Sequence, residues 1–136
     1  DVSESYQIIG DFYSQYVVNA TSVKEPTKEA YEELLKSLQV CIDKIEDYDY
    51  DDAAYIKLTM YQEIGNLLNH HRKGFATVKV EKKEVLRILE TVCKKAEALS
   101  VTQQSSMTIQ DHIQNFYPEY RENMERSYEN TEERGE

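Results

Sequence analysis

The chain has 136 residues, of which 40% are hydrophobic and 31% charged, a composition typical of a globular domain and unlike that of a disordered segment. This length is enough to bury a core without disulfides or a metal ion. The formal net charge of −10 argues against nonspecific binding to nucleic acid or to an anionic membrane, because both would repel the chain.

The first predicted helix runs from about residue 3 to residue 19. Its apolar residues recur every three or four positions, so they share one helix face. They are Ile9, Phe12, Tyr13, Tyr16 and Val17. Residues 21–25 are expected to form a connector.

The second predicted helix opens at Pro26 or Thr27 and has the clearest apolar face of the chain. Proline suits a first helical turn because its missing N–H would have no partner there. The apolar face consists of Tyr31, Leu34, Leu35, Leu38, Cys41, Ile42 and Ile45.

An acidic loop over residues 46–52 separates the second helix from the third. Asp51 or Asp52 is expected to cap the third helix, which runs to about Arg72, and Gly74 is expected to stop it in a left-handed conformation. Apolar residues cover much of its circumference, as in the central helix of a bundle. One stripe contains Ile56, Met60, Ile64 and Leu67, and Tyr55, Leu58, Tyr61 and Leu68 broaden it.

The segment 75–80 alternates in polarity, and we expect a connector or the start of the next helix there. A fourth helix is expected over residues 85–99, a loop over 100–106, and a short fifth helix over 109–117 that Pro118 ends or kinks. Tyr120, Met124 and Tyr128 extend a weaker apolar stripe beyond it.

These elements predict an all-α fold, an antiparallel bundle of four to five helices with no significant sheet. Residues 1–128 would form a single helical domain, and residues 129–136 an acidic, frayed tail. The predicted core consists of Ile9, Phe12, Leu34, Leu38, Ile42, Met60, Ile64, Leu89 and Val92.

No residue pattern points to a catalytic, cofactor or metal site, so we expect a protein that is not an enzyme. The acidic run from Asp47 has Asp52 and Leu58 where a calcium-binding EF-hand needs Gly and Glu. His70 and His71 are adjacent on a helix and diverge too widely to share one ion. Cys41 and Cys93 lie on apolar faces, which predicts buried free thiols, with one disulfide bridge as the alternative.

The chain has eleven tyrosines, several of which lie away from the best apolar stripes. Tyrosine buries a large ring while keeping a polar tip, so it is common at protein interfaces. Half-buried tyrosines of the bundle are the plainer interpretation. The tyrosines concerned are Tyr6, Tyr48, Tyr50, Tyr117, Tyr120 and Tyr128.

The favoured function is a protein-interaction module that binds an acidic amphipathic helix or peptide in the groove between the third and fourth helices. Helix three has apolar residues on two faces, and a locally basic stretch follows it. The predicted contact residues are Tyr55, Tyr61, Arg72, Lys79, Lys82 and Lys83. We expect no nucleic-acid partner and no membrane insertion.

We expect the chain to be a domain of a larger, cytoplasmic protein. Its start at Asp rather than Met fits excision from such a protein and also the processing of a secreted one. The alternative is a secreted four-helix signalling protein that binds a receptor. A glycosylation sequon at Asn19 and the even number of cysteines fit that alternative.

Overall fold

The structure is a computed structural model, and it describes residues 2–18, 25–102 and 118–130. It consists of α1 (Val2–Tyr13), the π-helix η1 (Ser14–Val18), α2 (Lys28–Glu46), α3 (Ala53–His70), α4 (Arg72–Thr77), α5 (Lys82–Thr102) and a helix of residues 118–130. No strand occurs among the described residues, and the predicted all-α fold is confirmed. The fifth helix expected over 109–117 and the sequon at Asn19 lie outside the described residues.

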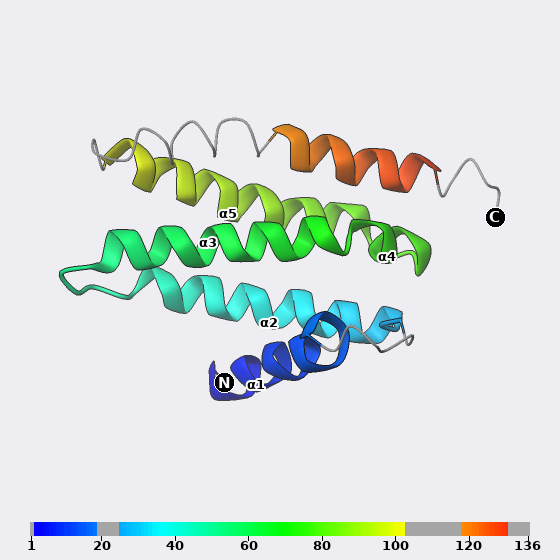
Figure 1. Cartoon of the computed structure of the whole chain (residues 1–136), viewed down its shortest axis with the longest axis horizontal. Coiled ribbons are helices and arrows are strands. Elements are labelled where there is room, and N and C mark those ends of the chain that lie inside the picture. Colours follow the sequence, from blue (N-terminus) through cyan, green and yellow to red (C-terminus); the bar gives the residue numbers. More distant parts are fainter. Residues whose placement is uncertain (1, 19–24, 103–117, 131–136) are drawn as a thin grey trace.

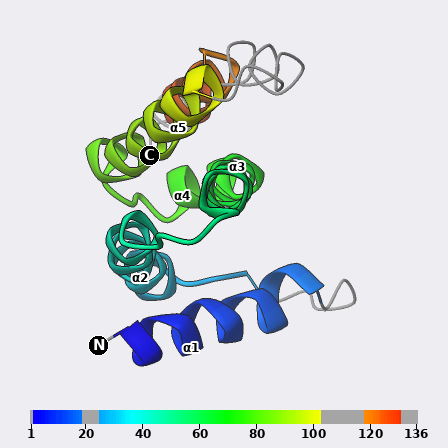
Figure 2. The same ribbon diagram turned by 90° about the vertical axis from the view of Figure 1, so that its left-hand side faces the viewer.

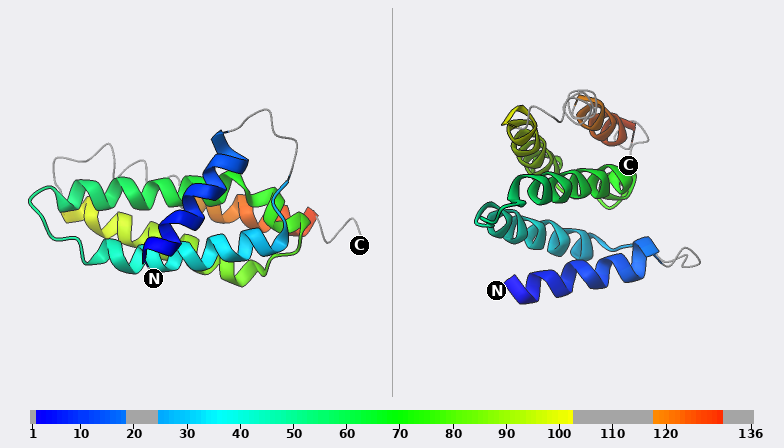
Figure 3. Two further views of the ribbon diagram at one scale, coloured as in Figure 1. Left: turned by 90° about the horizontal axis from the view of Figure 1, so that it is seen from below. Right: turned by 60° about the vertical axis from the view of Figure 1, so that its left-hand side comes forward.

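The long helices run antiparallel to one another along the chain (Figure 1). Helices α2, α3 and α5 pack pairwise, and the contact between α3 and α5 is the most extensive. Helix α1 packs on α2 from the outside and crosses it obliquely, while helix 118–130 lies on the opposite side of the molecule (Figures 2 and 3). No described helix combines the length and hydrophobicity that crossing a lipid bilayer requires.

Helix α2 is formed as its sequence predicts. Thr27 is the N-cap, because its side chain accepts a hydrogen bond from the backbone N–H of Ala30 at 3.1 Å, and Pro26 precedes this cap. All seven residues of the predicted apolar face are buried. A second part of the predicted core, Phe12 of α1 with Leu89 and Val92 of α5, is also buried, whereas Ile9 is only partly buried at the edge.

The face of α3 that meets the core differs from the predicted one. Met60 was expected in the core, but 41% of its surface is exposed. Ile64 and Leu67 of the predicted stripe are buried as expected, and the rest of the buried face consists of Leu58, Tyr61, Gly65 and Leu68. The prediction failed for Met60 because apolar residues surround this helix, so periodicity alone left two adjacent stripes that could face α5.

Gly74 does not end the third helix, contrary to the prediction. Helix α3 ends at His70, and Gly74 lies inside α4, where its missing side chain admits the ring of Tyr31. The left-handed residue is Lys79, with φ of 62°. The N–H groups of Lys79 and Val80 bond to the carbonyls of Ala76 and Phe75, which is a Schellman motif.

Two other boundaries also differ from those predicted. Helix α5 continues to Thr102, through residues 100–102 that were expected to begin a loop. Beyond Pro118 the described residues form a helix, whereas the sequence predicted only a weak apolar stripe there. The helix extends to residue 130, two residues into the predicted tail.

Helix 118–130 is anchored by its tyrosines. Tyr120, Met124 and Tyr128 are buried, so these two tyrosines do not line a surface. The hydroxyl of Tyr120 donates to Asn66 of α3, and that of Tyr128 donates to the carbonyl oxygen of Val80 at 2.6 Å. Arg121 forms an ion pair with Glu90 of α5, so the helix is tied to α3 through Tyr120 and to α5 through Arg121.

Candidate functional site

The six residues predicted to bind a partner are not brought into one surface. Tyr61 is buried, whereas Tyr55 is exposed in the first turn of α3. Lys79, Lys82 and Lys83 are exposed where α4 passes into α5, and Arg72 is half-buried at the start of α4. Tyr55 is therefore separated from the basic residues by roughly 25 Å of helix, at a rise of 1.5 Å per residue.

The groove between α3 and α5 is covered over part of its length by helix 118–130. Tyr120 packs its ring on Gly65 of α3, with 3.3 Å between its Cε2 atom and the position of an ideal β-carbon on that glycine. Asn123 reaches Asn69 of α3, and Arg121 reaches Glu90 of α5. The basic residues at the start of α5 remain exposed, and their contact with a partner stays a prediction.

The described residues include four exposed large apolar side chains, and three of them gather elsewhere. The four are Tyr6 (49% exposed), Tyr50 (70%), Tyr55 (60%) and Met60 (41%). Tyr6, Tyr50 and Met60 line one pocket of about 390 Å³, formed by α1, the C-terminal end of α2, the α2–α3 loop and α3. We call it the Tyr50 pocket.

The lining of the Tyr50 pocket is mainly apolar and aromatic. Ile45 is buried in its wall, and Ile56 and Tyr48 are half-buried. Lys44, Asp47 and Lys57 provide its charged groups. The volume falls at the lower end of the roughly 300–1,000 Å³ of typical ligand pockets, so the pocket can take one or two large side chains.

Local contacts organise the α2–α3 loop that forms one side of this pocket. The ammonium group of Lys57 donates to the carbonyl oxygen of Glu46 at 2.9 Å, which caps the end of α2 with a positive charge. The rings of Tyr48 and Tyr50 lie 4.8 Å apart between centroids at an interplanar angle of 58°. The Tyr48 hydroxyl points to Asp52, the residue before α3, at 3.5 Å.

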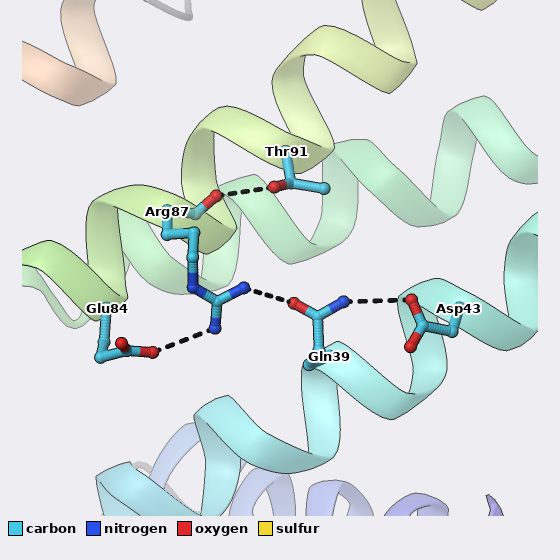
Figure 4. A network of polar contacts seen from close by, with 5 residues as sticks. All are labelled: Gln39, Asp43, Glu84, Arg87 and Thr91. Carbon is cyan, nitrogen blue, oxygen red and sulfur yellow. Dashed lines mark hydrogen bonds and ion pairs between the residues drawn. The ribbon is translucent and has the colours of Figure 1, made fainter.

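A second pocket, of about 500 Å³, lies between α2 and α5, and its polar groups engage one another. The guanidinium of Arg87 donates to the Gln39 amide oxygen at 2.8 Å and to Glu84 at 3.0 Å (Figure 4). Gln39 in turn donates to Asp43 at 3.1 Å. Because Arg87 and Glu84 are about half exposed, this ion pair within α5 contributes little stability. The hydrogen bond from Arg87 to Gln39 is the contact that links α5 to α2.

His71 lies in an aromatic cluster where α3 passes into α4. Its ring packs against Phe12 and Tyr31, and the Tyr31 hydroxyl is 3.4 Å from its Nδ1 atom. Within the described part of the chain, its buried Nε2 atom has no hydrogen-bond partner. Burial, with a smaller contribution from His70, lowers the pKa of His71 to about 4, so the ring is neutral at pH 7.

The cysteines offer no reactive group in this structure. Cys41 and Cys93 are buried free thiols, and burial raises the pKa of both, that of Cys93 to about 12. A thiol of this kind is a poor nucleophile at pH 7. Among the described residues, no three His, Cys, Asp or Glu side chains are placed to hold a metal ion.

Sequence reasoning did not identify the Tyr50 pocket, although part of the signal was present. Tyr6, Tyr48 and Tyr50 lie off the predicted apolar stripes, which singled them out as candidate surface residues. Their meeting in space depends on α1 crossing α2 near the α2–α3 loop, which no helical period encodes. Comparisons with protein-family models, with curated proteins and with solved structures found no match to this chain.

Proposed function

We propose that the chain is a non-catalytic protein-interaction module that binds a helix or peptide segment of another protein in the Tyr50 pocket. The observation that carries this proposal is that three of the four exposed large apolar side chains of the described residues line one pocket. Single exposed apolar residues are ordinary on protein surfaces, whereas a group of them around a concavity is typical of an interaction site.

The chemistry of the lining supports a protein ligand. Tyrosine is enriched among the residues that dominate binding energy at interfaces, because its rigid ring buries a large area at a small entropic cost. Met60 adds a flexible side chain that adapts to different partner surfaces. Tyr6, Tyr50 and Met60 of the lining are exposed, so a ligand can reach them without opening the core.

The protein is proposed to act inside the cell. The two buried free thiols fit a reducing compartment better than the oxidising environment in which disulfides persist.

The test is selection of peptides from an unbiased display library on the immobilised full chain, followed by affinity measurements on two variants of the pocket. Tyr50→Ala and Met60→Glu change exposed lining residues without touching the core. We expect selected peptides to lose roughly 30-fold in affinity for either variant, about 2 kcal/mol, as at an interface hot spot.

Tyr55→Ala is the matched control, because Tyr55 is nearly as exposed as Tyr50 but does not line the pocket. Its affinity for the same peptides should stay within about twofold of the wild type, well below the loss expected for a hot-spot residue. Failure to select any peptide that distinguishes Tyr50→Ala from Tyr55→Ala would overturn the proposal.

A further inference from the structure

The α2–α3 loop places an excess of negative charge beside the Tyr50 pocket. Asp47, Asp49, Asp51 and Asp52 are all exposed. None of these carboxylates forms an ion pair within the described part of the chain. The loop thus carries negative charges that a ligand could meet.

The pocket lining contains fewer positive charges than the loop has aspartates, and one of them, Lys57, already has a hydrogen-bond partner. Lys57 holds its ammonium group against the carbonyl oxygen of Glu46, where it balances the negative end of α2. The carboxylate of Glu46 forms an ion pair with Lys95 of α5, so it does not neutralise Lys57. Lys44 is the remaining cation in the pocket lining, against four aspartates on the loop.

The aromatic rings, like the aspartates, favour a positively charged ligand. A tyrosine ring carries partial negative charge on its face and attracts ammonium and, more often, guanidinium groups. Tyr50 is 70% exposed and is tilted against Tyr48, so its ring is available to a cation beside the loop carboxylates. A planar guanidinium could stack on such a ring while hydrogen-bonding to a neighbouring carboxylate.

From these charges and rings we propose that the occupant of the Tyr50 pocket is a basic segment of another protein, with arginine or lysine beside an aliphatic or aromatic anchor. The anchor would fill the apolar space between Ile45, Ile56 and Met60, and the cation would lie over Tyr50 near Asp47 and Asp49. The net charge of −10 steers such a segment toward the chain and repels an acidic one. This inference rests on the proposed function and names its partner class.

The first measurement is the composition of the library peptides whose binding depends on the pocket. Those that bind the wild type and Tyr55→Ala but not Tyr50→Ala should be enriched in arginine and lysine next to an apolar residue. Pocket-dependent peptides that are acidic or neutral would overturn this inference and leave the proposed function standing. Absence of any pocket-dependent peptide would overturn both.

The second measurement uses one selected peptide and two variants with equal loss of charge. The variant Asp47→Asn/Asp49→Asn/Asp51→Asn removes three of the four aspartate charges of the loop and leaves Asp52, the residue before α3, in place. The control Glu29→Gln/Glu32→Gln/Glu33→Gln neutralises three exposed carboxylates at the opposite end of α2. Circular dichroism melts establish that both variants fold.

We expect the loop variant to weaken binding by at least about tenfold and the control by less than about threefold, with wild-type binding falling as salt rises. Equal losses in the two variants would show that only the overall charge attracts the peptide, and would overturn the inference. A second copy of the chain is the competing occupant, since residues 79–83 are basic. If the chain dimerised with rising concentration and the loop variant abolished this dimerisation, the occupant of the pocket would be a second copy of the chain. That result would overturn the inference.

Discussion

Tyr31 of α2 lies directly against Gly74 of α4, so closely that a β-carbon on Gly74 would be 2.9 Å from the ring carbon Cζ of Tyr31 and closer still to its hydroxyl oxygen. Tyr31 is buried and also contacts Phe12, His71 and Phe75. Tyr31 therefore brings α1, α2 and α4 together, and its close contact with Gly74 explains why a glycine stands inside α4.

The first prediction compares two helical glycines. Gly74→Ala should destabilise the fold by about 1–3 kcal/mol, because Tyr31 would have to move out of a packed position. Gly10→Ala should instead stabilise it by about 0.5–1 kcal/mol, since nothing lies within 4 Å of a β-carbon there and alanine favours the helix. Urea unfolding of both variants measures the two effects, and a shared sign would contradict this account of Gly74.

The second prediction concerns acid and His71. Its pKa is about 4 in the fold and about 6.5 when unfolded, so between these values the unfolded chain binds more protons. The free energy of unfolding should therefore fall as the pH drops through this window, by on the order of 2–3 kcal/mol from this group. Unfolding at pH 7 and pH 4.5 measures the loss.

Because acidic residues also titrate near this window, the His71 contribution is read from a variant. His71→Phe keeps an aromatic ring beside Phe12 and Tyr31 and cannot take up a proton. Its stability should depend less on pH between 7 and 4.5 than that of the wild type. Parallel curves for the two proteins would mean that His71 is not held neutral by burial.

The third prediction concerns the left-handed Lys79. Lys79→Gly should raise the free energy of unfolding by about 1 kcal/mol, because a side chain at φ of 62° is strained and glycine is not. Lys83→Gly removes the same charge within α5, and it should cost up to about 1 kcal/mol instead. Thermal or urea melts should show that Lys79→Gly is more stable than the wild type and that Lys83→Gly is less stable.

The fourth prediction contrasts two apolar residues of the sequence-predicted core. Leu38→Ala should cost about 2–5 kcal/mol, since Leu38 is 2% exposed and truncation leaves a cavity. Met60→Ala should cost less than about 1 kcal/mol, because Met60 is at the surface. If chemical denaturation showed a large loss of stability for Met60→Ala, Met60 would have to be a core residue, contrary to this prediction.

What the sequence by itself determined is the presence of the helices α1, α2, α3 and α5 and the buried face of α2. A single stripe with charged residues on either side permits only one inward orientation, so the core positions of Leu34, Leu38 and Ile42 follow from the residue pattern alone. Thr27 was likewise one of two residues that the sequence offered as the start of this helix, and the structure shows it as the N-cap.

Only the tertiary structure decided which face of α3 is buried, why Gly74 is a glycine, and where Tyr6, Tyr50 and Met60 meet. The physical reason is that helical periodicity reports which residues share a face, but not which neighbour covers that face. Where apolar residues surround a helix, as on α3, packing against α2 and α5 selects among faces that local sequence leaves equivalent. The Tyr50 pocket depends in the same way on the crossing of α1 over α2, a contact that no residue pattern in either segment predicts.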